Sequence, residues 1–133
     1  NKNLNNVIFH SPVKRIDAPQ LLSIADCFLL PNLAGEFFQG NLPNKVFDYL
    51  ASSRPVIVAG RVESADLVEK IKAGFVVDAE NHKKLANTIK MVSIMDEAER
   101  EDIGLRGGIY VRKNYDRNIH ADIMSTILEN ASR

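Results

Sequence analysis

The stretch from Gly40 to Gly60, GNLPNKVFDYLASSRPVIVAG, constrains the fold more than any other part of the chain. Its first half has apolar residues at helical spacing and a proline, Pro43, at the expected first position of the helix. Its second half contains the wholly apolar run from Val56 to Ala59, which is typical of a strand covered on both faces. A loop, a helix and a buried parallel strand in this order build ligand sites at the carboxyl edge of α/β sheets. We therefore expect an α/β protein.

The rest of the chain repeats this alternation of strands and helices. The predicted strands are Asn6–His10, Cys27–Pro31, Val56–Ala59 and Gly74–Val77. The predicted helices are Asp17–Ala25, Pro43–Ser52, Ser64–Ala73 and His82–Met95, with Ser64 expected as an N-cap. The last third of the sequence predicts two helices that are separated by a break near Asn114-Tyr115. Gly107-Gly108 is expected to weaken the first of these helices. The pattern predicts a Rossmann-like parallel sheet of about four strands flanked by helices, in a single domain over residues 1–133.

Composition excludes several classes of function. The formal charges of the 133 residues sum to zero, and no basic stripe is present, which argues against a nucleic-acid partner. The apolar runs are far shorter than the ~20 residues that a membrane span needs, and the polar start NKNLNN is unlike a signal peptide. The single cysteine, Cys27, lies in an apolar strand and is expected to be a buried thiol, in keeping with a reducing, cytoplasmic setting.

The predicted helix at residues 43–52 carries the strongest functional signal. Lys45 and Asp48 are three residues apart, on one face near the helix start, where unpaired backbone amides favour an anion. A lysine there suits a phosphate, and a carboxylate one turn deeper can accept hydrogen bonds from vicinal hydroxyls such as those of a ribose. Gly40 would let the backbone pass close to a ligand. The spacing alone fits equally well a solvated ion pair on a helix surface, with Gly40 as an ordinary turn residue.

The residues around this pair resemble the signature of the group 1 glycosyltransferases of GT-B fold, G-x-x-P-x-K-x-x-[E/D]-Y-[LM]-A-x-x-[KR]-P-V-I. The chain supplies every defined position of it from Gly40 to Ile57. Flanking segments resemble the same family in the same order. They are NVIFHSPV from Asn6, LLSIADCFLLP from Leu21, AGFVVDAENHKKLANTI from Ala73 and KNYD from Lys113.

The resemblance implies retaining sugar transfer from a nucleotide diphosphate sugar, UDP- or GDP-linked, by a hexosyltransferase-type enzyme of cell-surface polysaccharide synthesis. Asp48 stands where the second of two family glutamates binds the ribose. Gly40 stands where the first would contact the donor sugar, and Glu36 is a candidate substitute. By analogy, the backbone from Gly40 through Asn41, Pro43 and Asn44 would face the diphosphate, and the loop Ser11–Arg15, with Val13 and Arg15, would lie beside the base.

No metal or other cofactor is expected, because His10, His82 and His120 are far apart in sequence and the GT-B fold needs no bound metal. Ser52 and Ser53 lack the setting of a nucleophile.

The resemblance extends over essentially the whole chain and implies that the chain is the latter part of a donor-binding domain. Full-length members also carry an N-terminal acceptor domain and a further βαβα stretch, so we expect no transferase activity from these residues alone. A bare sheet edge would invite self-association, and the full-length protein would fit a peripheral position at the inner membrane face. Two alternatives remain: a non-catalytic α/β interaction module that has lost the donor site, and a non-hydrolysing sugar-nucleotide epimerase, which matches PNKVFDYLASSRPVI less well.

Overall fold

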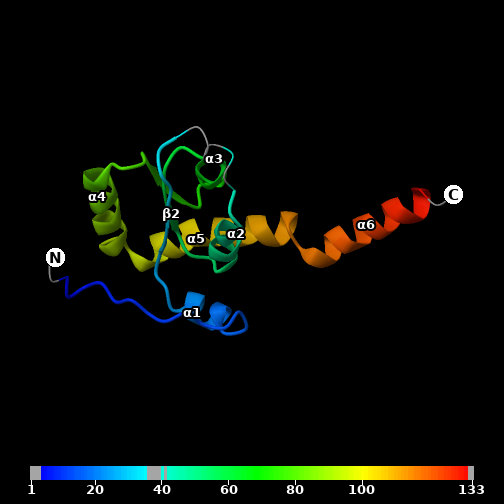
Figure 1. The fold of residues 1–133 in the computed structure, drawn as a ribbon, viewed down its shortest axis with the longest axis horizontal. Coiled ribbons are helices and arrows are strands. Elements are labelled where there is room, and N and C mark those ends of the chain that lie inside the picture. Colours follow the sequence, from blue (N-terminus) through cyan, green and yellow to red (C-terminus); the bar gives the residue numbers. More distant parts are fainter. Residues whose placement is uncertain (1–3, 36–39, 41, 132–133) are drawn as a thin grey trace.

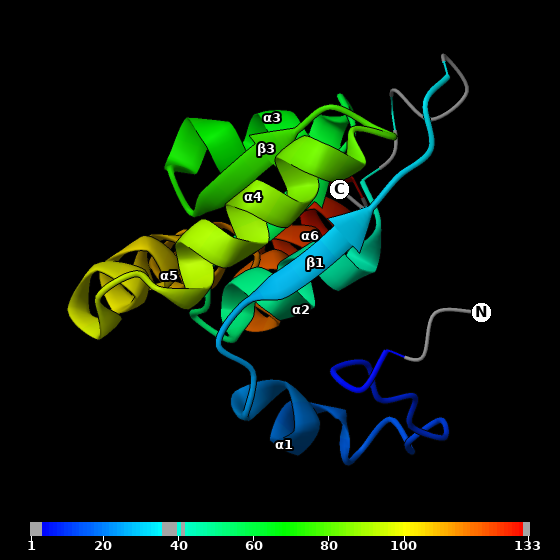
Figure 2. The ribbon, with the colours of Figure 1, turned by 90° about the vertical axis from the view of Figure 1, so that its left-hand side faces the viewer.

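The computed structural model describes residues 4–35, 40 and 42–131. Three strands form a parallel sheet in the order β1-β2-β3, with helices on both faces (Figure 1, Figure 2). The strands are β1 (Phe28–Pro31), β2 (Val56–Ala59) and β3 (Gly74–Val77). The helices are α1 (Ala18–Ser23), α2 (Asn44–Ala51), α3 (Glu63–Ile71), α4 (His82–Ser93), α5 (Glu97–Asn114) and α6 (Arg117–Ala131). The predicted α/β architecture is confirmed, including the break between the last two helices.

The segment Asn6–His10, which the sequence predicts as a strand, is not one. It lies apart from the sheet, in the blue segment that leads to α1 (Figure 1, Figure 2), and Phe9 is 94% exposed. A strand forms only where a neighbour pairs with its backbone N–H and C=O groups, and within the described part of the chain no strand is paired with this segment. Its apolar composition therefore does not produce a strand, and the described sheet has three strands instead of four.

Alternate residues of the strands face two different layers. On one face, Phe28 and Leu30 of β1 pack with Val46 and Leu50 of α2 in the main core. The ring of Phe28 also stacks on Tyr49 of α2, with ring centroids 4.3 Å apart and planes 5° apart. α4 covers the other face over β2 and β3 (Figure 2). All four residues of β2 are buried, which explains why its sequence is apolar throughout.

α5 packs against α2 through glycines. Gly104, Gly107 and Gly108 are its buried residues. A Cβ on Gly107 would lie 2.7 Å from Cδ2 of Leu50 in α2, and a Cβ on Gly108 would lie 2.1 Å from Oγ of Ser53. Although the sequence predicts that Gly107-Gly108 weakens this helix, α5 is continuous through both residues. Their missing side chains let α5 and α2 approach closely.

Two helix starts differ from the prediction. Pro43 has extended dihedral angles (φ −68°, ψ 144°) and is the N-cap of α2, one residue before its first helical position. Ser64 is not the N-cap of α3: that position belongs to Val62, whose carbonyl oxygen accepts hydrogen bonds from the N–H groups of Ala65 and Asp66. Ser64 is instead fully buried in the first turn, where its small side chain fits the core. None of the described helices is both long and apolar enough to cross a membrane.

Candidate functional site

The carboxyl ends of the three strands form one edge of the sheet, which we call the rim. Asn32, Gly60 and Asp78 directly follow β1, β2 and β3 at the rim. The N–H of Asn32 donates to the carbonyl of Ala59 at 2.8 Å, and the N–H of Gly60 donates to the carbonyl of Val77 at 2.8 Å. These bonds extend the pairing one residue past β1 and past β2, so the segments that leave the rim after these two strands start from fixed positions.

α2 begins at the rim, because it follows β1 and must run back to the start of β2. Its N-cap, Pro43, contributes no side-chain cap, and the first backbone bond of the helix runs from the N–H of Val46 to the carbonyl of Pro43 at 3.0 Å. The amides of Asn44 and Lys45 precede that bond and are therefore available at the helix start. The helix start thus offers bare amide donors together with the positive end of the helix dipole.

Lys45 and Asp48 are both exposed on the first two turns of α2. Asp48 lies in a hollow of about 320 Å³ between α1 and α2, with Pro19 and Leu22 of α1 opposite it. The carboxylate is thus accessible along the second half of α2, and it faces α1 instead of the middle of the rim. Asn44, Lys45 and Asp48 lie together on one short helix.

The other residues predicted for the site lie elsewhere or are less constrained. Val13 and Arg15 are exposed in the segment that leads to α1. Gly40 is exposed, and a Cβ built on it would meet nothing within 4 Å. Asn41 and Glu36 lie outside the described residues. The thiol of Cys27 is partly buried, and this burial raises its pKa to about 11, so the thiol stays protonated and unreactive at neutral pH.

Another hollow, of about 410 Å³, lies at the rim itself and was not predicted from the sequence; we call it the rim hollow. Its walls come from all three strand ends: Leu33 to Gly35 after β1, Arg61 and Val62 after β2, and Asp78 and Ala79 after β3. Arg61 and Asp78 each follow an apolar strand almost directly, which is the signal that could have found them.

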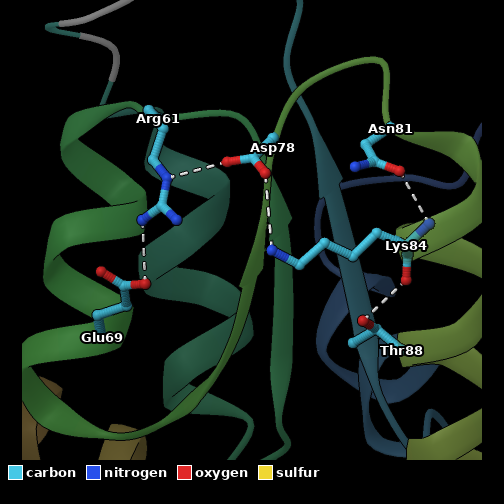
Figure 3. A network of polar contacts seen from close by, with 6 residues as sticks. All are labelled: Arg61, Glu69, Asp78, Asn81, Lys84 and Thr88. Carbon is cyan, nitrogen blue, oxygen red and sulfur yellow. Dashed lines mark hydrogen bonds and ion pairs between the residues drawn. The ribbon is translucent and has the colours of Figure 1, made fainter.

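A chain of charged groups runs from Glu69 of α3 through Arg61 and Asp78 to Lys84 of α4 (Figure 3). Of these residues, Arg61 and Asp78 line the rim hollow. Nε of Arg61 lies 3.3 Å from Oδ1 of Asp78, and Nη1 of Arg61 lies 3.2 Å from Oε1 of Glu69. Nζ of Lys84 lies 3.6 Å from Oδ2 of Asp78. The hydrogen bond from Arg61, followed by the charge of Lys84, lowers the pKa of Asp78, and the same bond raises the pKa of Arg61. Both groups therefore remain ionised at neutral pH.

The local structure of α4 holds Lys84 in this network. Asn81, the N-cap of α4, accepts a hydrogen bond from the backbone N–H of Lys84 at 3.0 Å (Figure 3). The hydroxyl of Thr88 donates to the carbonyl of Lys84 at 3.0 Å. Among the described residues, no three His, Cys, Asp or Glu side chains gather in a way that could hold a metal ion.

A family model described as "Glycosyl transferases group 1" matches residues 1–93 of the 133. The chain belongs to the group 1 glycosyltransferases. The resemblance seen in the sequence is thereby confirmed, and the matched part runs from the N-terminal segment through α4, so it includes α2 and the rim. The three-stranded parallel sheet is consistent with the Rossmann-like C-terminal domain of a GT-B glycosyltransferase. No curated protein and no solved structure matches the chain significantly.

Proposed function

We propose that this group 1 glycosyltransferase domain binds the nucleotide diphosphate part of a sugar donor at the start of α2. The observation that carries the proposal is the position of α2, whose first amides and exposed Lys45 lie at the carboxyl edge of a parallel sheet. Bare amides and the helix dipole favour a phosphate by about 0.3–1 kcal/mol for each charge at an exposed site. The ammonium of Lys45 adds a full positive charge beside them.

Asp48 is the residue that would bind the ribose in this proposal. Its carboxylate has two acceptor oxygens and is exposed one turn beyond Lys45, beside the hollow between α1 and α2. Two vicinal hydroxyls can donate to such a carboxylate. The ligand would then run from the amides at the start of α2, with the pyrophosphate, toward α1, with the nucleoside.

The wider proposal is retaining transfer of a hexosyl group from a UDP- or GDP-linked donor, in cell-surface polysaccharide synthesis. The acceptor would come from a second domain that faces the rim, because GT-B enzymes catalyse transfer in the cleft between two domains. We therefore expect nucleotide binding from this chain, and transferase activity only together with the acceptor domain. The donor is the substrate, and the proposal includes no metal or nucleic acid.

Gly40 favours a second candidate function. It stands where the family has a carboxylate for the donor sugar, and the space around it is open in the structure. A domain that has lost this contact could serve as a non-catalytic interaction module. The two functions differ in one simple property, since only the first requires saturable binding of a nucleoside diphosphate.

Calorimetric titration with UDP, GDP and ADP separates the two functions. We expect one diphosphate to bind, and we expect Lys45→Ala and Asp48→Ala each to weaken it about tenfold, equivalent to about 1.4 kcal/mol. Lys83→Ala on α4 and Asp122→Ala on α6 are matched controls, because both residues are exposed and neither lies on α2. Absence of binding, or equal losses in the control variants, would contradict the proposal.

A further inference from the structure

We infer that the rim hollow binds the sugar part of the donor, a neutral and hydroxyl-rich group, through Asp78 and Arg61. This inference rests on the proposed function, because it extends the nucleotide site along the same rim. The starting observation is that the rim hollow is walled by the ends of all three strands and is crossed by an ionised Arg61–Asp78 pair.

The charges around the rim hollow decide which kind of ligand it suits. The cations Arg61 and Lys84 are balanced by the carboxylates of Asp78 and Glu69 (Figure 3). A phosphate placed here would meet two carboxylates, and the positive charge is already neutralised. A sugar carries no charge, and its hydroxyls can donate to a carboxylate and accept from a guanidinium at the same time.

Arg61 and Asp78 retain unused hydrogen-bonding groups for a sugar. An ionised carboxylate has about four lone-pair sites on its two oxygens, and a guanidinium has five N–H donors. Arg61 uses Nε and Nη1 in its two ion pairs, and Asp78 uses one contact at each oxygen. The side chains of Arg61 and Asp78 remain more than half exposed. Because Arg61 and Lys84 hold Asp78 from both sides, the carboxylate is oriented before a ligand arrives.

The position along the rim fits a ligand that extends from α2. Neighbouring strands lie about 4.8 Å apart, so the end of β3 lies roughly 10 Å along the rim from the end of β1. A nucleotide sugar with its pyrophosphate at the start of α2 could place its sugar over the ends of β2 and β3. Asp78 would then supply the carboxylate that Gly40 does not, from a different strand end.

The test compares each nucleotide with its sugar conjugate in calorimetric titrations: UDP with UDP-glucose, and GDP with GDP-mannose. The expected result is that one conjugate binds more tightly than its nucleotide, and that Asp78→Ala removes this gain while leaving the affinity for the nucleotide unchanged. Asp78→Asn should remove most of the gain as well, because it loses the charge but keeps the shape. Asp122→Ala on α6 is the control and should keep the gain. The ion pairs of Asp78 are exposed, so both variants should fold normally, which circular dichroism would verify.

The outcomes distinguish this inference from the proposed function. If a nucleotide binds but no conjugate gains affinity, or if the gain survives in Asp78→Ala, the sugar site is refuted and the nucleotide site stands. If no nucleotide binds, the proposed function fails, and the methyl glycosides of glucose, mannose and galactose then test the rim hollow directly by NMR. Shifts of the amides at residues 33–35, 61 and 78–79 that are lost in Asp78→Ala would support the sugar site, and their absence would overturn it.

Discussion

Replacing Gly104 with alanine is expected to destabilise the fold by about 2 kcal/mol, although alanine is the better helix former. Gly104 lies in α5 where this helix passes over the turn between α2 and β2. A Cβ at this position would lie 2.3 Å from the carbonyl oxygen of Ser53 and 2.7 Å from Cα of Arg54. Both are backbone atoms of a turn that connects two core elements, so neither can rotate away as the end of a side chain could.

The magnitude follows from two opposing contributions. Alanine gains about 1 kcal/mol over glycine in a helix interior. Overpacking a close contact typically costs about 1–3 kcal/mol, and we take the upper end because α5 must move away from α2 as a whole. The net loss of about 2 kcal/mol would be measured as the change in free energy of unfolding in urea, followed by far-UV circular dichroism.

Gly40→Ala is the matched control for this measurement. A Cβ at Gly40 meets nothing within 4 Å, so this substitution should change stability by no more than about 0.5 kcal/mol. A Gly104→Ala protein as stable as the wild type, or more stable, would refute the close packing of α5 on α2.

Three further predictions concern the core, the thiol and the loop before α2. Leu50→Ala should lower the free energy of unfolding by about 3 kcal/mol, because Leu50 is fully buried against α5 and the sheet. If urea denaturation gave a decrease in this free energy well below 1 kcal/mol, the place of Leu50 in the core would be contradicted. The alkylation rate of Cys27 should keep rising with pH toward its pKa of about 11, and a plateau near pH 9 would contradict the burial. Because the pKa of the folded state lies above that of the unfolded state, the unfolded thiol releases its proton first, and this group's contribution to stability is lost as the pH rises from about 9 to 11. Gly40→Glu places a carboxylate where the family has one, and the space around this position is open, so the variant should fold normally. In calorimetric titrations it should bind a nucleotide sugar more tightly than the wild type does. An unchanged affinity would argue against a sugar near Gly40.

The elements that could be predicted from the sequence are those whose signal is local. The runs at residues 27–31, 56–59 and 74–77 predicted β1, β2 and β3 to within one residue. Strands between two layers of helices are apolar, and β2, which is buried at all four residues, is the clearest case. The segment at residues 6–10 has a similar composition, but whether it forms a strand depends on a neighbour, which no local pattern reveals. Gly107-Gly108 misled for a related reason. Glycine has a low helix propensity, but the close packing of α5 on α2 leaves no room for a side chain at Gly107 or Gly108.

The same distinction applies to the site. Lys45 and Asp48 could be found from spacing because both lie on one helix, where three residues place side chains on the same face. Arg61 and Asp78 are seventeen residues apart and meet only because β2 and β3 are adjacent and parallel. Their ion pair is a property of the sheet topology, so neither residue is conspicuous in the sequence by itself.

The most direct test of the central claim is an NMR titration of the ¹⁵N-labelled chain with UDP and with GDP, read at the backbone amides. If the pyrophosphate binds at the start of α2, the largest shifts should appear at the amides of Asn44 and Lys45, and in Lys45→Ala they should need about tenfold more nucleotide to reach half of their full size. Saturable shifts centred on α5 or α6, with the amides of α2 unchanged, would contradict the claim.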